Sequence, residues 1–121
     1  MIEQFEEFER LYRAVYPPEI MSMFWKENGE ISSAAFKDKR GLSVERAGDR
    51  EENEVISDMH LYFYGIIVSV LTRDCLECKA IIKYLPSKRS TYHSEIHGGE
   101  NRILLSQSQC KHLAKRARLC G

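Results

Sequence analysis

The first fifteen residues carry apolar side chains at intervals of three and four positions, which is the spacing of one face of an α-helix. The spacing predicts a helix from about Ile2 to Val15. Glutamates crowd its first half, where the helix dipole favours negative charge, and we expect Arg13 to form a salt bridge with them. Pro17-Pro18 ends the helix, because the residue before a proline is driven out of helical geometry. The expected apolar face consists of Phe5, Phe8, Tyr12 and Val15.

Two later segments show the same periodicity together with capping signals at their starts. We predict a central helix over residues 50–63 and a C-terminal helix over residues 107–119. In each, a short polar residue precedes the apolar stripe and an acid or amide follows three positions on, as in a capping box. The capping pairs are Asp49 with Glu52 and Ser106 with Gln109.

The remaining apolar segments favour strands. Residues 65–71 form an unbroken, β-branched run, which is typical of a strand buried on both faces. After a polar turn at 72–74, residues 78–85 are expected to return as its partner, and residues 92–97 to add another strand. Helices at the N-terminus, the centre and the C-terminus, around a small and mostly antiparallel sheet, predict an α+β fold with residues 1–121 as a single domain. Shorter strands are expected at 31–36 and 42–45.

The composition excludes several classes of protein. Hydrophobic residues make up 43% of the chain and charged residues 30%, so a disordered chain is not expected. The longest uncharged, mostly apolar run, 61–72, is shorter than the ~20 residues that a membrane span needs. The acidic N-terminus lacks the features of a secretion signal, and four cysteines in that context indicate reduced thiols. We therefore expect a cytoplasmic protein with no membrane partner.

Charge is distributed unevenly although the formal net charge is zero. Residues 1–60 hold fourteen Asp and Glu against eight Lys and Arg, whereas residues 61–121 hold four against ten. We favour the interpretation that the two halves attract one another, within the fold or in a homodimer. The alternative is that the C-terminal half presents a basic face to an anionic partner.

The densest group of titratable side chains is His93, Glu95 and His97. Its neighbours favour a strand, which would put all three side chains on one face and the two histidine Cα atoms ~13 Å apart. That separation is at the limit for two imidazoles to share one metal ion, so we expect no cofactor, with a metal bound by a neighbouring pair as the alternative. A histidine beside a carboxylate is a candidate general acid or base, which makes these three the candidate catalytic residues. The other interpretation is a polar solvent face on an edge strand.

Basic residues surround this cluster in the sequence. Lys88, Arg89 and Arg102 are candidate anion-binding residues, and Tyr84 and Tyr92 are placed to stack on bases. The sequence therefore favours a binding or interaction module whose basic half meets nucleic acid or another protein. The alternative is a small, nuclease-like enzyme that acts on phosphodiesters, with the two histidines as its acid and base.

The cysteines have spacing that is compatible with a zinc site, but their context argues against one. Cys75 and Cys78 are separated by two residues, and Cys110 with His112 could complete a set of four ligands. No glycine follows either cysteine of the pair, and Cys110 lies on the apolar stripe of its helix, where a thiol packs as a small hydrophobe. We predict that the cysteines hold no structural zinc.

Overall fold

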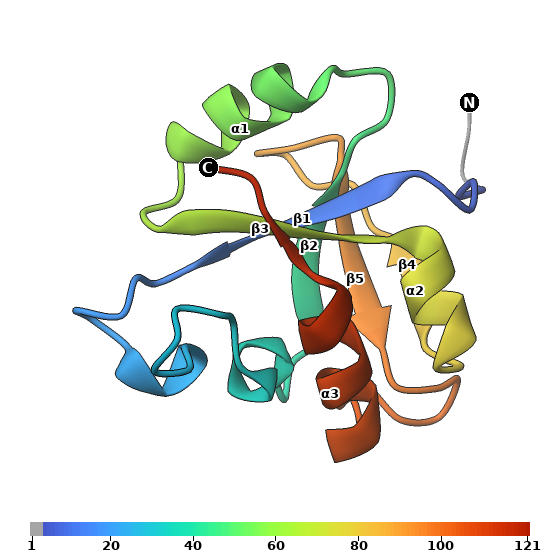
Figure 1. Ribbon diagram of the computed structural model, residues 1–121. Helices are drawn as coiled ribbons and strands as arrows, with labels where there is room; N and C mark the ends of the chain where they lie inside the picture. The colour runs from blue at the N-terminus through green and yellow to red at the C-terminus, as the bar shows by residue number, and fades with distance from the viewer. Residues whose placement is uncertain (1–3) are drawn as a thin grey trace.

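The computed structural model describes residues 4–121, which form one six-stranded antiparallel sheet with helices on both faces (Figure 1). The strand order is β4-β5-β2-β1-β3-β6. This arrangement confirms the predicted α+β fold with a mostly antiparallel sheet. The strands are β1 (Arg10–Val15), β2 (Leu42–Arg46), β3 (Ile66–Leu71), β4 (Ile81–Tyr84), β5 (His93–His97) and β6 (Arg118–Leu119). The helices are α1 (Glu52–His60), α2 (Thr72–Glu77), α3 (Gln107–Arg116) and the 3-10 helices η1 (Ser22–Phe24) and η2 (Ser33–Phe36).

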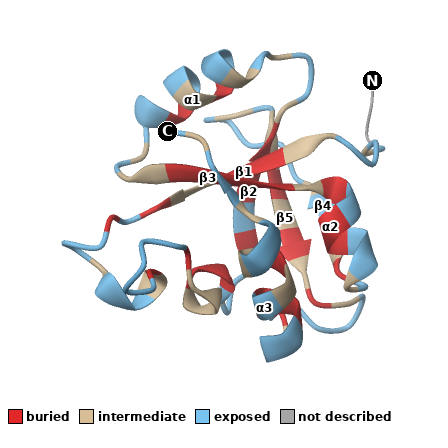
Figure 2. Cartoon of the chain, viewed as in Figure 1, coloured by how far each residue is buried: buried red, intermediate tan, exposed pale blue. Residues whose placement is uncertain are grey.

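Each face of the sheet is covered by its own layer of helices. Helix α1 lies on one side of β3, whereas α3 and the two 3-10 helices lie on the other (Figure 1). A small apolar cluster under α1 joins Tyr12 and Ile67 of the sheet to Val55 and Met59 of the helix. The central strands are accordingly buried along most of their length, while the outer surfaces of the helices are exposed (Figure 2).

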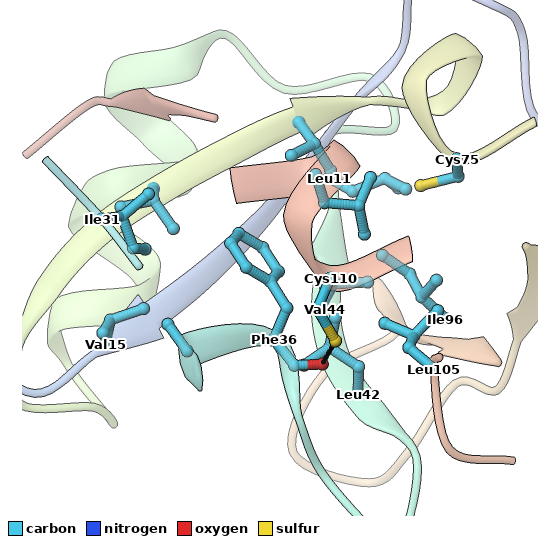
Figure 3. Close-up of a cluster of buried hydrophobic side chains, with 14 of the residues drawn as sticks. Leu11, Val15, Ile31, Phe36, Leu42, Val44, Cys75, Ile96, Leu105 and Cys110 are labelled. Atoms are coloured by element: carbon cyan, nitrogen blue, oxygen red, sulfur yellow. Dashed lines mark hydrogen bonds between the residues drawn. The ribbon is translucent and has the colours of Figure 1, made fainter. Parts of the chain in front are cut away.

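The larger core lies between the sheet, η2 and α3. Phe36 of η2, Leu42 of β2 and Ile96 of β5 are each at most 2% exposed there (Figure 3). Cys110 of α3 packs in the same layer, and its thiol points at the carbonyl oxygen of Phe36, 3.5 Å away. Leu105, directly before the N-cap residue of α3, packs at the edge of the cluster beside Ile96 (Figure 3).

The expected N-terminal helix is wrong, because its second half is strand β1. Residues 2 and 3 lie outside the described part of the chain. Leu11 and Tyr12 are adjacent yet both buried, since β1 is a central strand with one residue packed on each face. A strand covered on both faces loses the two-residue alternation that identifies strands in sequence. Phe8, on the expected apolar face, is 67% exposed.

The expected pairing of residues 65–71 with residues 78–85 is also wrong. Strand β3 forms as predicted but pairs with β1 and β6, and β4 pairs with β5. The polar segment after β3 continues into helix α2 rather than a turn, with Leu71 N donating to Asp74 Oδ2 at 2.8 Å. Residues 33–36 are the 3-10 helix η2 rather than a strand.

Several local predictions are confirmed. Strands β2 and β5 and helices α1 and α3 lie within or next to the predicted segments. The capping box of α3 is formed, because Ser106 Oγ accepts from Gln109 N at 3.2 Å and Gln109 Oε1 accepts from Ser106 N at 2.8 Å. Helix α1 instead begins after Glu51, whose backbone N–H donates to Glu54 Oε1 at 2.9 Å, two residues later than predicted.

Strands β1 and β2 separate after a short contact. β1 pairs with β3 along its whole length, from Arg10 to Val15, but with β2 only at Leu11 and Tyr12. Figure 1 shows the result, with β1 and β3 running across the view and β2 and β5 running steeply down it. A twisted sheet whose neighbouring strands part in this way leaves a wedge between them.

A buried ion pair holds the closed end of this wedge. Arg46 Nη2 lies 2.7 Å from Glu9 Oε1, and Arg46 Nε donates to Glu9 Oε2 at 2.8 Å. The backbone N–H of Gly48 donates to the same carboxylate at 2.9 Å. The side chain of Arg46 is 5% exposed and that of Glu9 is 10% exposed. Water therefore solvates neither charge well, and the two charges stabilise one another.

Replacing Glu9 with Gln should lower the free energy of unfolding by about 3 kcal/mol, because the buried guanidinium of Arg46 loses the charge of the Glu9 carboxylate. Urea denaturation at pH 7 measures this change. The exposed Glu7 gives a matched control, and Glu7→Gln should change stability by less than about 0.5 kcal/mol. A Glu9→Gln protein as stable as the control would contradict the assigned role of the pair.

Candidate functional site

The candidate catalytic residues lie on strand β5, as predicted. His93, Glu95 and His97 are half-buried and share one face of the strand, while Ser94 and Ile96 are buried on the other. The strand is not at an edge of the sheet, since β2 and β4 flank it. The three side chains therefore lie on a partly covered surface of the sheet, and their surroundings differ.

Glu95 and His97 form a closed pair. His97 Nε2 lies 2.8 Å from Glu95 Oε1, and the two side chains are 20% and 12% exposed for Glu95 and His97 respectively. Gly41 lies directly over them with a φ of +102°, and a Cβ at this position would collide with the Glu95 carboxylate. The missing side chain at residue 41 thus lets the loop before β2 pack onto the pair.

His93 is held differently and faces open space. Its Nδ1 lies 2.8 Å from the carbonyl oxygen of Leu85, just beyond the end of β4. Its Nε2 lies 3.5 Å from the hydroxyl of Ser43 on β2. Ser43 is exposed, so the structure brings His93 together with a hydroxyl rather than with His97.

His93 and Ser43 line a hollow at the mouth of the β1/β2 wedge, which we call the split pocket. It has a volume of about 410 Å³. Its charged lining consists of Arg13, Arg40, Asp38 and Glu45, and its ring side chains are Tyr12, Tyr16, Phe63 and His93.

Arg13 crosses the wedge. Its Nε donates to the carbonyl oxygen of Ala35 in η2, and its Nη1 donates to the carbonyl oxygen of Ser43, both at 3.1 Å. Its expected salt bridge with the N-terminal glutamates is wrong, because β1 carries the side chain away from them. Burial lowers the pKa of Arg13, and the negative charge of Asp38 opposes that shift.

The candidate anion-binding residues Lys88 and Arg89 line a second hollow, which we call the loop pocket. It has a volume of about 290 Å³ and shares Phe63 with the split pocket. Its two carboxylates, Glu45 and Asp58, lie 3.3 Å and 3.0 Å from the guanidinium of Arg50, which offsets one of their two charges. The guanidinium of Arg89 lies 5.0 Å from the centre of the Phe63 ring.

A third hollow completes the surface. It has a volume of about 230 Å³ and is lined by Ala14 and a set of rings. Phe63 lines all three hollows, so they adjoin one another around its side chain. We call this surface the Phe63 groove. The rings of the third hollow are Tyr16, Tyr62, Phe63 and Tyr64.

The remaining candidates lie away from the groove or are engaged in packing. Arg102 donates from Nη2 to the carbonyl oxygen of Gly98 and to Gln109 Oε1, so its guanidinium braces the loop before α3. Tyr84 donates to the carbonyl oxygen of Thr91 at 2.6 Å. The ring of Tyr92 is covered by the guanidinium of Arg50, 3.6 Å from its centre.

Arg40 and Ser43 are not predicted from the sequence, and Arg13 has a different role from the one expected. The available signal was an arginine set in the apolar run Leu11–Val15, together with Gly41 immediately before a strand. Neither feature identifies a pocket until β1 and β2 are known to be neighbours.

The cysteines are packed into the fold. Cys75 and Cys110 are buried, and burial raises the pKa of both thiols. The pKa of Cys78 is also raised by burial, and its thiol donates to the carbonyl oxygen of Cys75 at 3.3 Å. His112, the expected fourth ligand, instead has Nε2 3.3 Å from Glu77 Oε1. Within residues 4–121 no three His, Cys, Asp or Glu side chains are grouped to hold a metal ion.

Metal analysis of protein purified without a histidine tag should find well under one zinc per chain. The reason is that a thiol must lose its proton to bind zinc, and burial of these cysteines favours the protonated form. A stoichiometric zinc whose removal by a chelator unfolds the protein would overturn this prediction.

A double-mutant cycle should separate the two histidines. Glu95→Gln combined with His97→Ala should show a coupling energy of about 1 kcal/mol or more, because the two side chains share a half-buried hydrogen bond. Glu95→Gln combined with His93→Ala is the matched control, since His93 bonds elsewhere, and its coupling should stay within about 0.5 kcal/mol. Urea denaturation of the parent, the three single variants and the two double variants provides the measurement. Equal coupling energies in the two cycles would contradict the assignment of His97, and not His93, as the partner of Glu95.

Within the described part of the chain, no helix is long and apolar enough to cross a membrane. Comparisons with protein-family models, with curated proteins and with solved structures gave no match. The geometry of the Phe63 groove is therefore the basis for any functional conclusion.

Proposed function

We propose that this protein binds single-stranded nucleic acid along the Phe63 groove. The observation that carries the proposal is that the ring of Phe63 lines all three hollows, and that two of these hollows are also lined by cations. Arg13 and Arg40 line the split pocket, whereas Lys88 and Arg89 line the loop pocket. In the proposed complex, phosphates lie at both places and a base lies near Phe63 between them.

The charge of the groove supports an anionic ligand. Five cations line the two hollows, namely Arg13, Arg40, Arg50, Lys88 and Arg89, against three carboxylates, Asp38, Glu45 and Asp58, two of which are bound by Arg50. Among residues 4–121, no carboxylate lies within 4.0 Å of the charged nitrogens of the four groove cations. Positive side chains free of acidic partners attract phosphate and release counterions when it binds. These cations are Arg13, Arg40, Lys88 and Arg89.

The rings of the groove support a ligand with exposed bases. Three tyrosines of the groove have large exposed fractions: 49% for Tyr16, 59% for Tyr62 and 67% for Tyr64. Contact with water alone does not stabilise an aromatic ring. Bases of a single strand stack on such rings, whereas the bases of a duplex are already stacked on one another. Tyr84 and Tyr92, the rings expected from the sequence, are used in packing, and the exposed tyrosines around Phe63 take their place in the proposal.

A cytoplasmic location is part of the same proposal. The fold buries Cys75 and Cys110 as free thiols, which suits a reducing compartment where nucleic acid is present. A protein partner at the same surface is the competing outcome, and the binding experiment below separates the two.

Binding of a fluorescein-labelled single-stranded oligonucleotide, followed by anisotropy, tests the proposal. Arg40→Ala should weaken binding about tenfold by removing one charge-assisted phosphate contact. Lys39→Ala removes the same charge from the neighbouring exposed residue, which does not line the split pocket, and should leave affinity nearly unchanged. Binding should weaken as salt rises, and Arg40→Ala should reduce the slope of log K against log salt by about 0.7.

The second pair of cations has its own control. Lys88→Ala with Arg89→Ala should weaken binding more than Lys111→Ala with Lys115→Ala, which removes two exposed charges from α3. Absence of binding at low salt, or equal effects of groove and control variants, would overturn the proposal. A mononucleotide that competes as well as the oligonucleotide would reduce the site to one nucleotide.

A further inference from the structure

The hydroxyl of Ser43 is the exposed nucleophile nearest to a base in the split pocket. Ser43 on β2 lies opposite Glu95 on β5. His93, two residues before Glu95 on the same face of β5, is therefore diagonally opposite Ser43. From that position the imidazole reaches the hydroxyl, with Nε2 3.5 Å from Oγ. Catalytic hydrogen bonds are often this long before a substrate binds.

The contact of His93 with Leu85 determines which ring nitrogen faces Ser43 as a base. A carbonyl oxygen can only accept a hydrogen bond, so Nδ1, 2.8 Å from the Leu85 oxygen, must carry the proton. In the neutral imidazole Nε2 is then the unprotonated nitrogen. His93 therefore presents an acceptor to Ser43 and is oriented from behind, which is the arrangement of an activated nucleophile, a base and an orienting group.

Positive charge lies at the same place. Arg13 donates to the backbone carbonyl of Ser43, and both Arg13 and Arg40 line the pocket into which the hydroxyl opens. Arg13 Nη2 makes no hydrogen bond within the described residues, so its donors remain for a ligand. Arginine side chains stabilise the charge that develops on a phosphoryl group during transfer.

We propose that Ser43 and His93 form a phosphodiester-cleaving centre in the split pocket, with Ser43 as nucleophile and His93 as general base and acid. The substrate class rests on the proposed binding of nucleic acid. His97 has no part in it, because it is paired with Glu95 beneath Gly41.

The reaction has two steps. Ser43 Oγ attacks phosphorus and gives its proton to His93 Nε2; the phosphorus–oxygen bond to the leaving alcohol breaks on the opposite side of phosphorus, and that oxygen takes a proton from solvent. A water then attacks the phosphoserine diester from that opposite side and loses a proton to solvent; the bond to Ser43 breaks, and Oγ recovers the proton held on His93 Nε2. The net change is hydrolysis of one diester to an alcohol and a phosphomonoester.

Labelling with a dialkyl fluorophosphate tests the nucleophile without any need for nucleic acid. Oγ bonds to phosphorus, fluoride leaves, and the proton passes through His93 to solvent. Intact-protein and peptide mass spectrometry should find one dialkylphosphoryl group, on Ser43. Ser43→Ala should abolish labelling, His93→Gln should slow it by about 100-fold or more, and Ser87→Ala, at an exposed serine outside the pocket, should change nothing.

Turnover is measured separately, as hydrolysis of bis(4-nitrophenyl) phosphate by the same proteins, and Ser43→Ala should abolish it. No label on the parent protein, or equal labelling of Ser43 in the parent and in His93→Gln, would overturn the inference. If His93→Gln does not fold, absence of the label from Ser43→Ala and its persistence in Ser87→Ala would support the nucleophile. Labelling at Ser43 without oligonucleotide binding would sustain the centre and refute the proposed function alone.

Discussion

The separation of β1 from β2 is the constraint on which the rest of the site depends. Because β1 follows β3 for its whole length, its last residues leave β2 and carbonyl groups along the gap need other donors. Arg13 supplies them, reaching Ala35 on one side and Ser43 on the other. The guanidinium thus closes the wedge near the core and leaves its outer part as a pocket. The Glu9–Arg46 pair stabilises the point where the strands still touch.

The two histidines of β5 show how the same strand face yields two environments. His97 lies toward the end where β2 and its preceding loop fold over the sheet, and Gly41 presses on its carboxylate partner. His93 lies toward the other end, where the β4–β5 connection supplies the Leu85 carbonyl and where the wedge opens. The imidazole of His97, bound to a carboxylate and 12% exposed, is a packing element, whereas that of His93, held by a carbonyl beside a hollow, turns its other nitrogen toward the hydroxyl of Ser43.

The sequence was sufficient for the fold class, for strands β3 and β5 and for the capping box of α3, because these depend on local patterns. It was insufficient for β1 and for the pairing of β4, because a strand buried on both faces has no alternation and pairing is decided by distant segments. The histidine cluster was found by composition alone, and only His93 of its two histidines lies in the pocket. Arg40 and Ser43 are site candidates only because they line the pocket at the β1/β2 wedge, and no local sequence pattern predicts that wedge.

Arginine at position 13 meets two demands that a lysine would not meet together. Its planar group holds two carbonyls at 3.1 Å in fixed directions and keeps further donors for a third partner. Burial lowers its pKa, which means that the fold pays for placing a charge there. Under the proposed function, the donors that remain on this guanidinium are those that bind an anion in the split pocket.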